Sequence, residues 1–169
     1  MRKAGKRRAM ALLNTLSNFH TNIKNNLERH KLQSVLDALM QCQETAIELG
    51  NLIESSEGEG FVTISFLEEY CEVVFQIYDN LSRIRDVQAG DVPSASSGIN
   101  PNKIYKTLNK LIIKAENSVK YDIKIRKEAV FLPYKASMWD SLESVWQSAE
   151  ADPDCDAYVI PIPYFDKNP

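Results

Sequence analysis

Four residues near the C-terminal end of the sequence have side chains suited to binding an anion that carries a ring. They are Tyr134, Lys135, Ser137 and Trp139. A lysine ammonium supplies positive charge, aromatic rings stack on bases or sugars, and the free amides at a helix start attract anions. We therefore expect an anion-binding loop here. The alternative is that Ser137 only caps a helix, Trp139 is a core residue and Lys135 is solvated.

The sequence around this loop predicts a strand, a helix and a second strand. Residues 129–132 form a short apolar run of the kind found in strands that are buried on both faces. Ser137 precedes Asp140 by three residues, which predicts a capped helix start, and the helix should end at Asp152, before a proline. Residues 158–162 form the second apolar run. The apolar positions expected to pack this helix on the sheet are Trp139, Leu142, Val145 or Trp146, and Ala149.

A strand, a crossover helix and a strand form a βαβ unit with parallel strands. Ligands of such sheets bind beyond the carboxyl ends of the strands, so residues 133–137 and 163–166 should border the site. Two parallel strands need further strands beside them and cover on both faces. We therefore expect these 169 residues to be the front part of a larger protein.

Two segments, VFLPYKASMWDSLESVW and DPDCDAYVIPIPYFDKNP, resemble the start of the catalytic region of bacterial CDP-glycerol glycerophosphotransferases, the teichoic-acid polymerase and primase family. The resemblance covers about a quarter of the chain. It implies a Rossmann-like domain of glycosyltransferase B type and transfer of a polyol phosphate from a cytidine-diphosphate donor to a polymer or lipid-linked acceptor. The loop of Tyr134, Lys135, Ser137 and Trp139 would then border the acceptor side of the cleft. No residue of this chain matches the family's catalytic histidines or donor-binding residues, so we expect no turnover by the chain alone.

The residues before this unit predict an antiparallel bundle of about four helices. Apolar side chains recur at steps of three and four in residues 5–29, 32–53 and 64–88, and again from Asn100 or Pro101 onwards. In the first helix the series runs through Leu12 or Leu13, Leu16, Phe19, Ile23 and Leu27. The fold class is therefore an α-rich α+β chain, in which a helical bundle precedes a single βαβ unit. The predicted domains are residues 1–88 as bundle, 89–101 as flexible linker, 102–127 as fourth helix and connector, and 128–169 as the βαβ unit.

A second group of candidate binding residues lies at the N-terminus. It is the basic cluster Arg2, Lys3, Lys6, Arg7 and Arg8, which could attract an anionic membrane surface. The alternative is a frayed, solvated terminus. On the fourth helix, the polar side carries Lys103, Lys106, Lys110 and Lys114, either as a solvated face or as a strip that binds a phosphate polymer.

Other classes of site lack support in the sequence. His20 and His30 are ten residues apart, too far for a metal pair on one helix face, and we expect both to be exposed or half-buried. Cys42, Cys71 and Cys155 form no CxxC pair and are predicted to be reduced thiols. We predict no metal and no cofactor. A net charge of −3 disfavours nucleic-acid binding, because the basic surface is not sustained.

The function predicted is that of the N-terminal part of a glycerophosphotransferase-like protein, cytoplasmic and peripheral on the inner face of the bacterial membrane. Its bundle would serve oligomerisation, attachment or support. The partners would be the rest of the parent polypeptide or a second copy in a homodimer. The alternative is a self-contained helical interaction module with a βαβ appendage and no enzymatic role.

Overall fold

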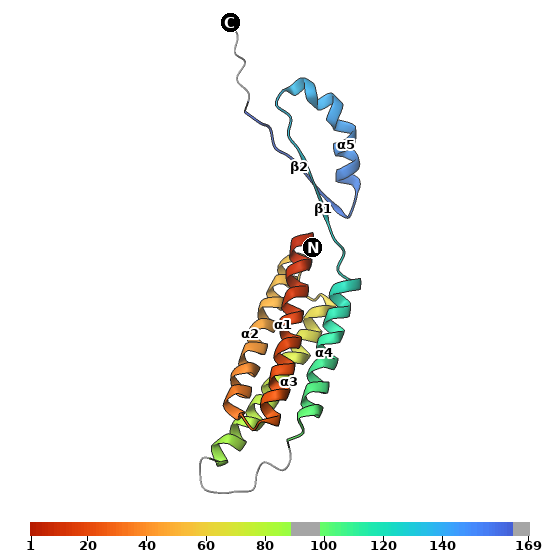
Figure 1. Ribbon diagram of the computed structural model, residues 1–169. Coiled ribbons are helices and arrows are strands. Elements are labelled where there is room, and N and C mark those ends of the chain that lie inside the picture. Colours follow the sequence, from red (N-terminus) through yellow and green to blue (C-terminus); the bar gives the residue numbers. More distant parts are fainter. Residues whose placement is uncertain (89–98, 164–169) are drawn as a thin grey trace. The chain divides into compact units, whose positions relative to one another are not determined.

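The computed structural model describes residues 1–88 and 99–163 and is helix-rich with one small parallel sheet (Figure 1). In chain order its elements are α1 (Lys3–Glu28), α2 (Leu32–Glu57), α3 (Val62–Gln88), α4 (Pro101–Tyr121), β1 (Lys127–Phe131), the 3₁₀ helix η2 (Ala136–Met138), α5 (Trp139–Ala151) and β2 (Cys155–Val159). These residues form two compact units. The bundle unit runs from Ala4 to Ile123, and the sheet unit combines Met1–Lys3 with the chain from Lys124 onwards.

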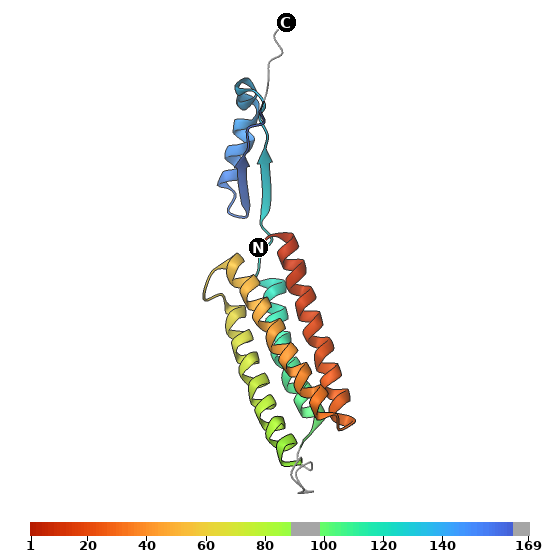
Figure 2. The same cartoon turned by 90° about the vertical axis from the view of Figure 1, so that its left-hand side faces the viewer.

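The bundle unit consists of α1 to α4, which lie side by side in both ribbon views (Figures 1 and 2). Neighbouring helices run in opposite directions, as ion pairs between them show: Arg8 of α1 pairs with Glu48 of α2, and Lys114 of α4 pairs with Glu69 of α3. The core is made of apolar side chains at helical spacing from all four helices. Its largest fully buried members include Leu13, Leu16, Ile23, Leu36, Leu39, Leu49, Ile53, Tyr70, Leu108 and Ile112. Within the described ranges, no helix has the length and apolar character needed to cross a bilayer.

Local signals set the ends of the bundle helices. The side chain of Asn100 accepts a hydrogen bond from the backbone amide of Lys103, and Pro101 occupies the first turn, so α4 begins where the sequence predicts. The second helix extends to Glu57 and turns at Gly58 and Gly60, whose φ angles are 91° and 79°. Glycine adopts this left-handed geometry without steric cost. Of the predicted linker 89–101, residues 89–98 lie outside the described part of the chain.

The sheet unit contains two parallel strands with α5 between them in sequence. Lys127 aligns with Cys155, and the register continues to Phe131 opposite Val159. The two strands begin two and three residues earlier than the sequence predicts, because the pairing starts in the residues that precede the apolar runs. On α5, Trp139, Leu142, Trp146 and Ala149 are half-buried, as predicted for the face that packs on the sheet, whereas the alternative member Val145 is 58% exposed.

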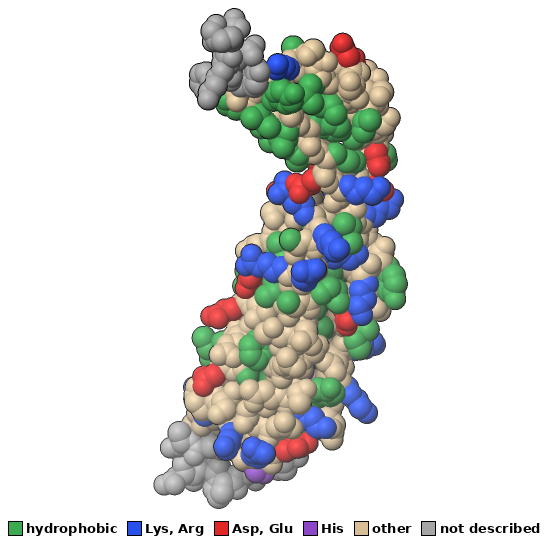
Figure 3. Space-filling model, turned by 45° about the horizontal axis from the view of Figure 1, so that its top comes forward, with side chains coloured by type: hydrophobic (Ala, Val, Ile, Leu, Met, Phe, Trp, Pro, Cys, Tyr) green, Lys and Arg blue, Asp and Glu red, His purple; other side chains and the backbone are tan. Residues whose placement is uncertain are grey.

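The prediction that the first strand is buried on both faces is wrong for this chain. Val130 and Leu132 are 51% and 50% exposed, and Tyr158 and Ile160 beside them are also exposed. A single helix can cover only one face of a sheet, so the alternate side chains of each strand remain in solvent. Figure 3 shows the hydrophobic side chains that gather on this unit.

The first residues of the chain belong to the sheet unit. The carbonyl of Met1 accepts a 2.9 Å hydrogen bond from the amide of Arg126, and Arg2 and Arg126 form a parallel bridge at the start of β1. The guanidinium of Arg126 also pairs with Asp156 of β2, and this hydrogen bond lowers the pKa of the Asp156 carboxyl. The N-terminus therefore pairs with the chain just before β1, on the edge that does not face β2.

Candidate functional site

The loop singled out from the sequence borders a shallow hollow of about 480 Å³ at the carboxyl ends of β1 and β2. The residues around this hollow are Pro133, Tyr134, Lys135, Ala136, Trp139, Pro161 and Ile162. Three of the four predicted residues are thus brought together, and Ser137 is not among them. The position agrees with the rule that ligands of parallel sheets bind beyond the carboxyl ends of the strands. Of the second loop expected here, only Pro163 falls within the described residues.

The charged and aromatic groups of the hollow come from adjacent residues. The Lys135 ammonium lies 5.9 Å from the centroid of the Tyr134 ring, within reach of a cation–π contact. Lys135 has an extended backbone, and its carbonyl accepts a hydrogen bond from the amide of Met138, which closes the turn of η2. The Tyr134 side chain is 45% exposed. Both side chains are therefore accessible from solvent.

Ser137 does not cap the helix, so this prediction is wrong. It lies inside η2, and α5 begins at Trp139 with Met138 as its N-cap residue, which makes no side-chain cap bond. The extra 3₁₀ turn moves the start of α5 two residues past Ser137, and Ser137 itself is exposed.

Trp139 combines a packing role with a place at the hollow. The residue is half-buried, and its ring lies against that of Trp146 about two helical turns further along, with the centroids 5.5 Å apart and the planes tilted by 53°. Tilted aromatic pairs of this kind are favourable. Trp139 therefore packs within α5 and also borders the hollow.

The groups of the hollow that the structure describes suit binding. They are one cation, two aromatic rings and apolar walls, with no carboxylate, imidazole or thiol among the described lining residues. Lysine and tyrosine side chains can also transfer protons when a reacting group lies within hydrogen-bond reach. The chemistry of the hollow suits an anionic group next to a flat ring or sugar.

The N-terminal basic cluster is largely occupied by contacts within the protein. Arg2 pairs with Glu128 and Arg8 with Glu48, each at 2.7 Å. The Lys6 ammonium donates to the carbonyls of Lys120 and Ile123, at 2.8 and 2.6 Å, and so satisfies the C-terminal end of α4. Within the described ranges, Lys3 and Arg7 make no ion pair. Lys3 and Arg7 are therefore the members of the cluster that need not give up an ion pair or a hydrogen bond of the described part in order to bind an anionic surface.

The most connected polar group in the described bundle is one that the sequence reading missed. His20 is fully buried, contrary to the prediction that it is exposed or half-buried. Its Nδ1 donates to the side-chain oxygen of Asn109 at 2.9 Å, and its Nε2 accepts from the hydroxyl of Tyr70 at 2.8 Å. Cys42 of α2 is also fully buried; burial raises the pKa of the Tyr70 hydroxyl, and the proximity of Cys42 raises it further. Residues from α1, α3 and α4 thus form one hydrogen-bonded chain through the core.

Burial controls the protonation of this chain. Desolvation lowers the pKa of His20, and the hydrogen bond to Asn109 offsets this only in part. Burial also raises the pKa of Cys42 to about 11 and raises that of Tyr70. The chain is therefore neutral near pH 7. Because a substrate has no access to it, its role is to fix how the helices pack.

A signal for His20 exists in the sequence. Leu16, His20, Ile23 and Leu27 are separated by four, three and four residues, which is the spacing of a buried face of a helix. The series that contains Phe19 fits this spacing equally well. The structure buries His20, whereas Phe19 is half-buried. A histidine at such a position requires partners from other helices, and the sequence alone does not name them.

In the described part of the chain, no group of three or more His, Cys, Asp or Glu side chains is placed to hold a metal ion.

Comparison with known proteins finds no protein family, no curated protein and no solved structure that matches this chain.

Proposed function

We propose that this chain is the N-terminal part of a CDP-glycerol glycerophosphotransferase-like protein that transfers a polyol phosphate to a cell-wall polymer or a lipid-linked acceptor. The observation that carries the proposal is the position of the PYKASMW segment, whose Tyr134, Lys135 and Trp139 meet at the carboxyl ends of two parallel strands. The segments that resemble the family are the ones that build this hollow.

The open face of the sheet supports a larger domain. Val130, Leu132, Tyr158 and Ile160 leave an apolar surface in solvent on the side that α5 does not cover. Parallel sheets normally have helices on both faces and further strands at their edges. A Rossmann-like domain of glycosyltransferase B type would supply both from the rest of the parent polypeptide.

In this proposal the hollow holds part of the acceptor. The ammonium of Lys135 attracts a phosphate, while Tyr134 and Trp139 pack against the neighbouring polyol or sugar. In this proposal the groups that activate the acceptor and bind the donor come from outside these residues, because no residue of this chain matches the family's catalytic histidines or donor-binding residues. The chain by itself then binds without turnover.

The proposed location is cytoplasmic, at the inner face of the membrane where lipid-linked acceptors are used. A base near anionic headgroups contributes about 1 kcal/mol, so Lys3 and Arg7 alone would hold the protein weakly. Support or oligomerisation is therefore the main role that we assign to the bundle.

Two experiments test the proposal. The gene should continue past the codon for Pro169 into further strands and a second Rossmann-like domain, and a stop codon directly after Pro169 would overturn it. Calorimetric titration of this chain with CDP-glycerol should show no binding, since the donor site lies elsewhere. Heat of specific donor binding to residues 1–169 would contradict the assignment.

The role of Lys135 is tested in the parent protein. Lys135→Ala should raise KM for the acceptor about tenfold with little change in kcat, because it removes one charge-assisted contact. The matched control is Lys124→Ala, an exposed lysine of the sheet unit away from the hollow. Equal kinetics for Lys135→Ala and the wild type would remove the loop from acceptor binding.

A further inference from the structure

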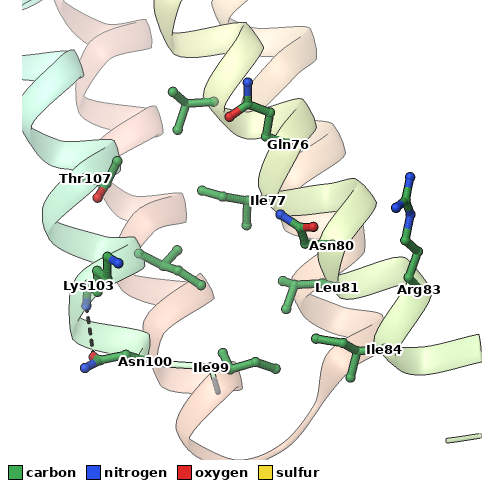
Figure 4. A pocket seen from close by; sticks show the side chains of 12 residues that line it. Gln76, Ile77, Asn80, Leu81, Arg83, Ile84, Ile99, Asn100, Lys103 and Thr107 are labelled. Carbon is green, nitrogen blue, oxygen red and sulfur yellow. Dashed lines mark hydrogen bonds between the residues drawn. The ribbon is translucent and has the colours of Figure 1, made fainter. Parts of the chain in front are cut away.

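The bundle has an apolar groove of about 800 Å³ between α3 and α4 (Figure 4). Its floor is made of aliphatic side chains from both helices and from the residue that precedes Asn100: Val73, Ile77, Leu81, Ile84, Ile104 and Ile99. The polar side chains around them include Gln76, Asn80, Arg83 and Lys103. Exposure of these apolar side chains to water is unfavourable, and burying them against another apolar surface would be favourable.

The two helices that form the banks of the groove carry opposite net charge, although Arg83 of α3 lines the groove as a cation paired with Asp79. The outer side of α4 has Lys103, Lys106 and Lys110, all exposed and without an ion pair among the described residues. The helix on the other bank, α3, carries the acids Glu68, Glu69, Glu72, Asp79 and Asp86 against two arginines. The carboxylate of Glu72 is exposed and bonded only to Gln76 in the described part, and Asp79 pairs with Arg83.

The Lys114–Glu69 ion pair sets the relative level of the two helices. Counted from this pair along antiparallel helices, Lys110 lies level with Val73, and Lys103 lies level with Asn80. At a rise of about 1.5 Å per residue, Lys103 and Lys110 are about 10 Å apart along α4. Glu72 and Asp79 have the same separation in sequence on α3. The spacing of cations on one bank therefore equals the spacing of anions on the other.

We propose that the α3/α4 face is the interface of a homodimer. A two-fold axis parallel to the bundle places α4 of each copy over α3 of the other, whereas an axis across the bundle would place α3 over α3 and repel. In the first arrangement the two grooves close on each other. Lys110 then faces Glu72 of the second copy, and Lys103 faces its Asp79.

Charge complementarity selects a second copy over other occupants. An anionic membrane or a linear polyanion would match the α4 bank and be repelled by the acids of α3. An acidic partner protein would meet the same obstacle. Only a surface that carries both signs at the same spacing, with an apolar centre, fits both banks, and the face itself is such a surface. This inference is independent of the function proposed for the sheet unit.

The test is a charge swap followed by analytical ultracentrifugation. Wild-type chain should sediment as a dimer in low salt, with a Kd that rises as salt is added. The variant Lys103→Glu/Lys110→Glu and the variant Glu72→Lys/Asp79→Lys should each be monomeric, with a Kd weakened roughly a hundredfold, because each places like charges in contact. An equimolar mixture of the two variants should dimerise again, since every contact is then between opposite charges.

The mixture separates loss of the interface from loss of folding, because misfolded chains do not regain a partner on mixing. The matched control, Arg7→Glu/Arg29→Glu, changes the net charge equally at exposed positions outside α3 and α4, and it should remain dimeric. Several outcomes would overturn the proposal. One is a wild type that is monomeric in low salt, and another is a dimer that persists in both charge-reversal variants. A third is a mixture of the variants that stays monomeric. The last is a monomeric wild type that binds to phosphatidylglycerol vesicles and loses this binding in the double lysine variant.

Discussion

The hydroxyl of Tyr70 donates a 2.8 Å hydrogen bond to Nε2 of His20, and neither side chain is exposed to solvent. The two rings lie 5.7 Å apart on helices that are not consecutive in the chain, α1 and α3. A buried polar contact of this kind costs free energy in any packing that separates its partners. The apolar faces alone would allow several packings of these helices. The His20–Tyr70 hydrogen bond therefore favours one rotation of α1 about its axis and one position of α3 along its axis.

The buried histidine makes the bundle acid-sensitive. The pKa of His20 is lowered by burial, whereas an unfolded histidine titrates near pH 6.5. Below about pH 6.5, His20 therefore binds a proton in the unfolded state but not in the folded state. As a result, the free energy of unfolding falls as the pH falls. The slope should reach about 1.4 kcal/mol per pH unit.

Urea unfolding followed by circular dichroism between pH 7.5 and pH 5.5 measures this slope. His20→Gln should flatten it, while His30→Gln, which changes the exposed histidine, should leave it unchanged. A wild-type slope that persists in the His20→Gln variant would place the titrating group elsewhere.

Tyr70→Phe should destabilise the bundle through one missing hydroxyl. It leaves the Nε2 of His20 buried without a donor, which costs about 1–3 kcal/mol in the free energy of unfolding. Tyr121→Phe removes a hydroxyl from a side chain that is 79% exposed and should have no measurable effect. Equal midpoints in urea for both variants would show that the His20–Tyr70 bond does not contribute.

The start of α4 offers a test of local capping. Asn100→Ala removes the acceptor for the amide of Lys103 and should cost about 1 kcal/mol, with faster amide exchange in the first turn of α4. Asn102→Ala, at an exposed position within that turn, is the matched control and should change the exchange rates little. Unchanged protection in Asn100→Ala would mean that Pro101 alone defines the helix start.

The buried thiol of Cys42 and the half-buried thiol of Cys155 should differ in reactivity. Cys42 is fully buried and has its pKa raised to about 11, so at pH 8 it is almost entirely a protonated thiol away from solvent. A disulfide reagent added to native protein should label Cys155 and leave Cys42 unmodified until the bundle unfolds. Mass spectrometry of the labelled peptides gives the order, and early labelling of Cys42 would contradict the burial.

Much of the helical part follows from sequence because its signals are local. Apolar residues that recur every three or four positions predict α1 to α3 to within a few residues, and the Asn100–Pro101 pair marks the start of α4. The pairing of β1 with β2 in parallel follows from the strand–helix–strand order. These inferences need only the neighbouring residues in the chain.

Most of the misses depend on residues distant in sequence, and one depends on a local turn. An apolar run such as residues 129–132 is the same whether one face or two are covered, so sequence could not reveal that Val130 is half-exposed. Ser137 has the spacing of a cap, but the chain inserts η2 before α5 begins. His20 and the basic cluster show the same limit, because their partners, Tyr70, Glu48 and Glu128, lie 40 or more residues away.

The contacts that Lys6 makes with the carbonyls of Lys120 and Ile123 join residues 114 and 117 positions apart. During synthesis, α1 emerges from the ribosome long before this acceptor exists, and α1 cannot dock on α4 until the chain has been translated past Ile123. The bundle is therefore expected to complete its folding only once the nascent chain exposes the last turn of α4, and a ribosome stalled earlier should display α1 open to proteases.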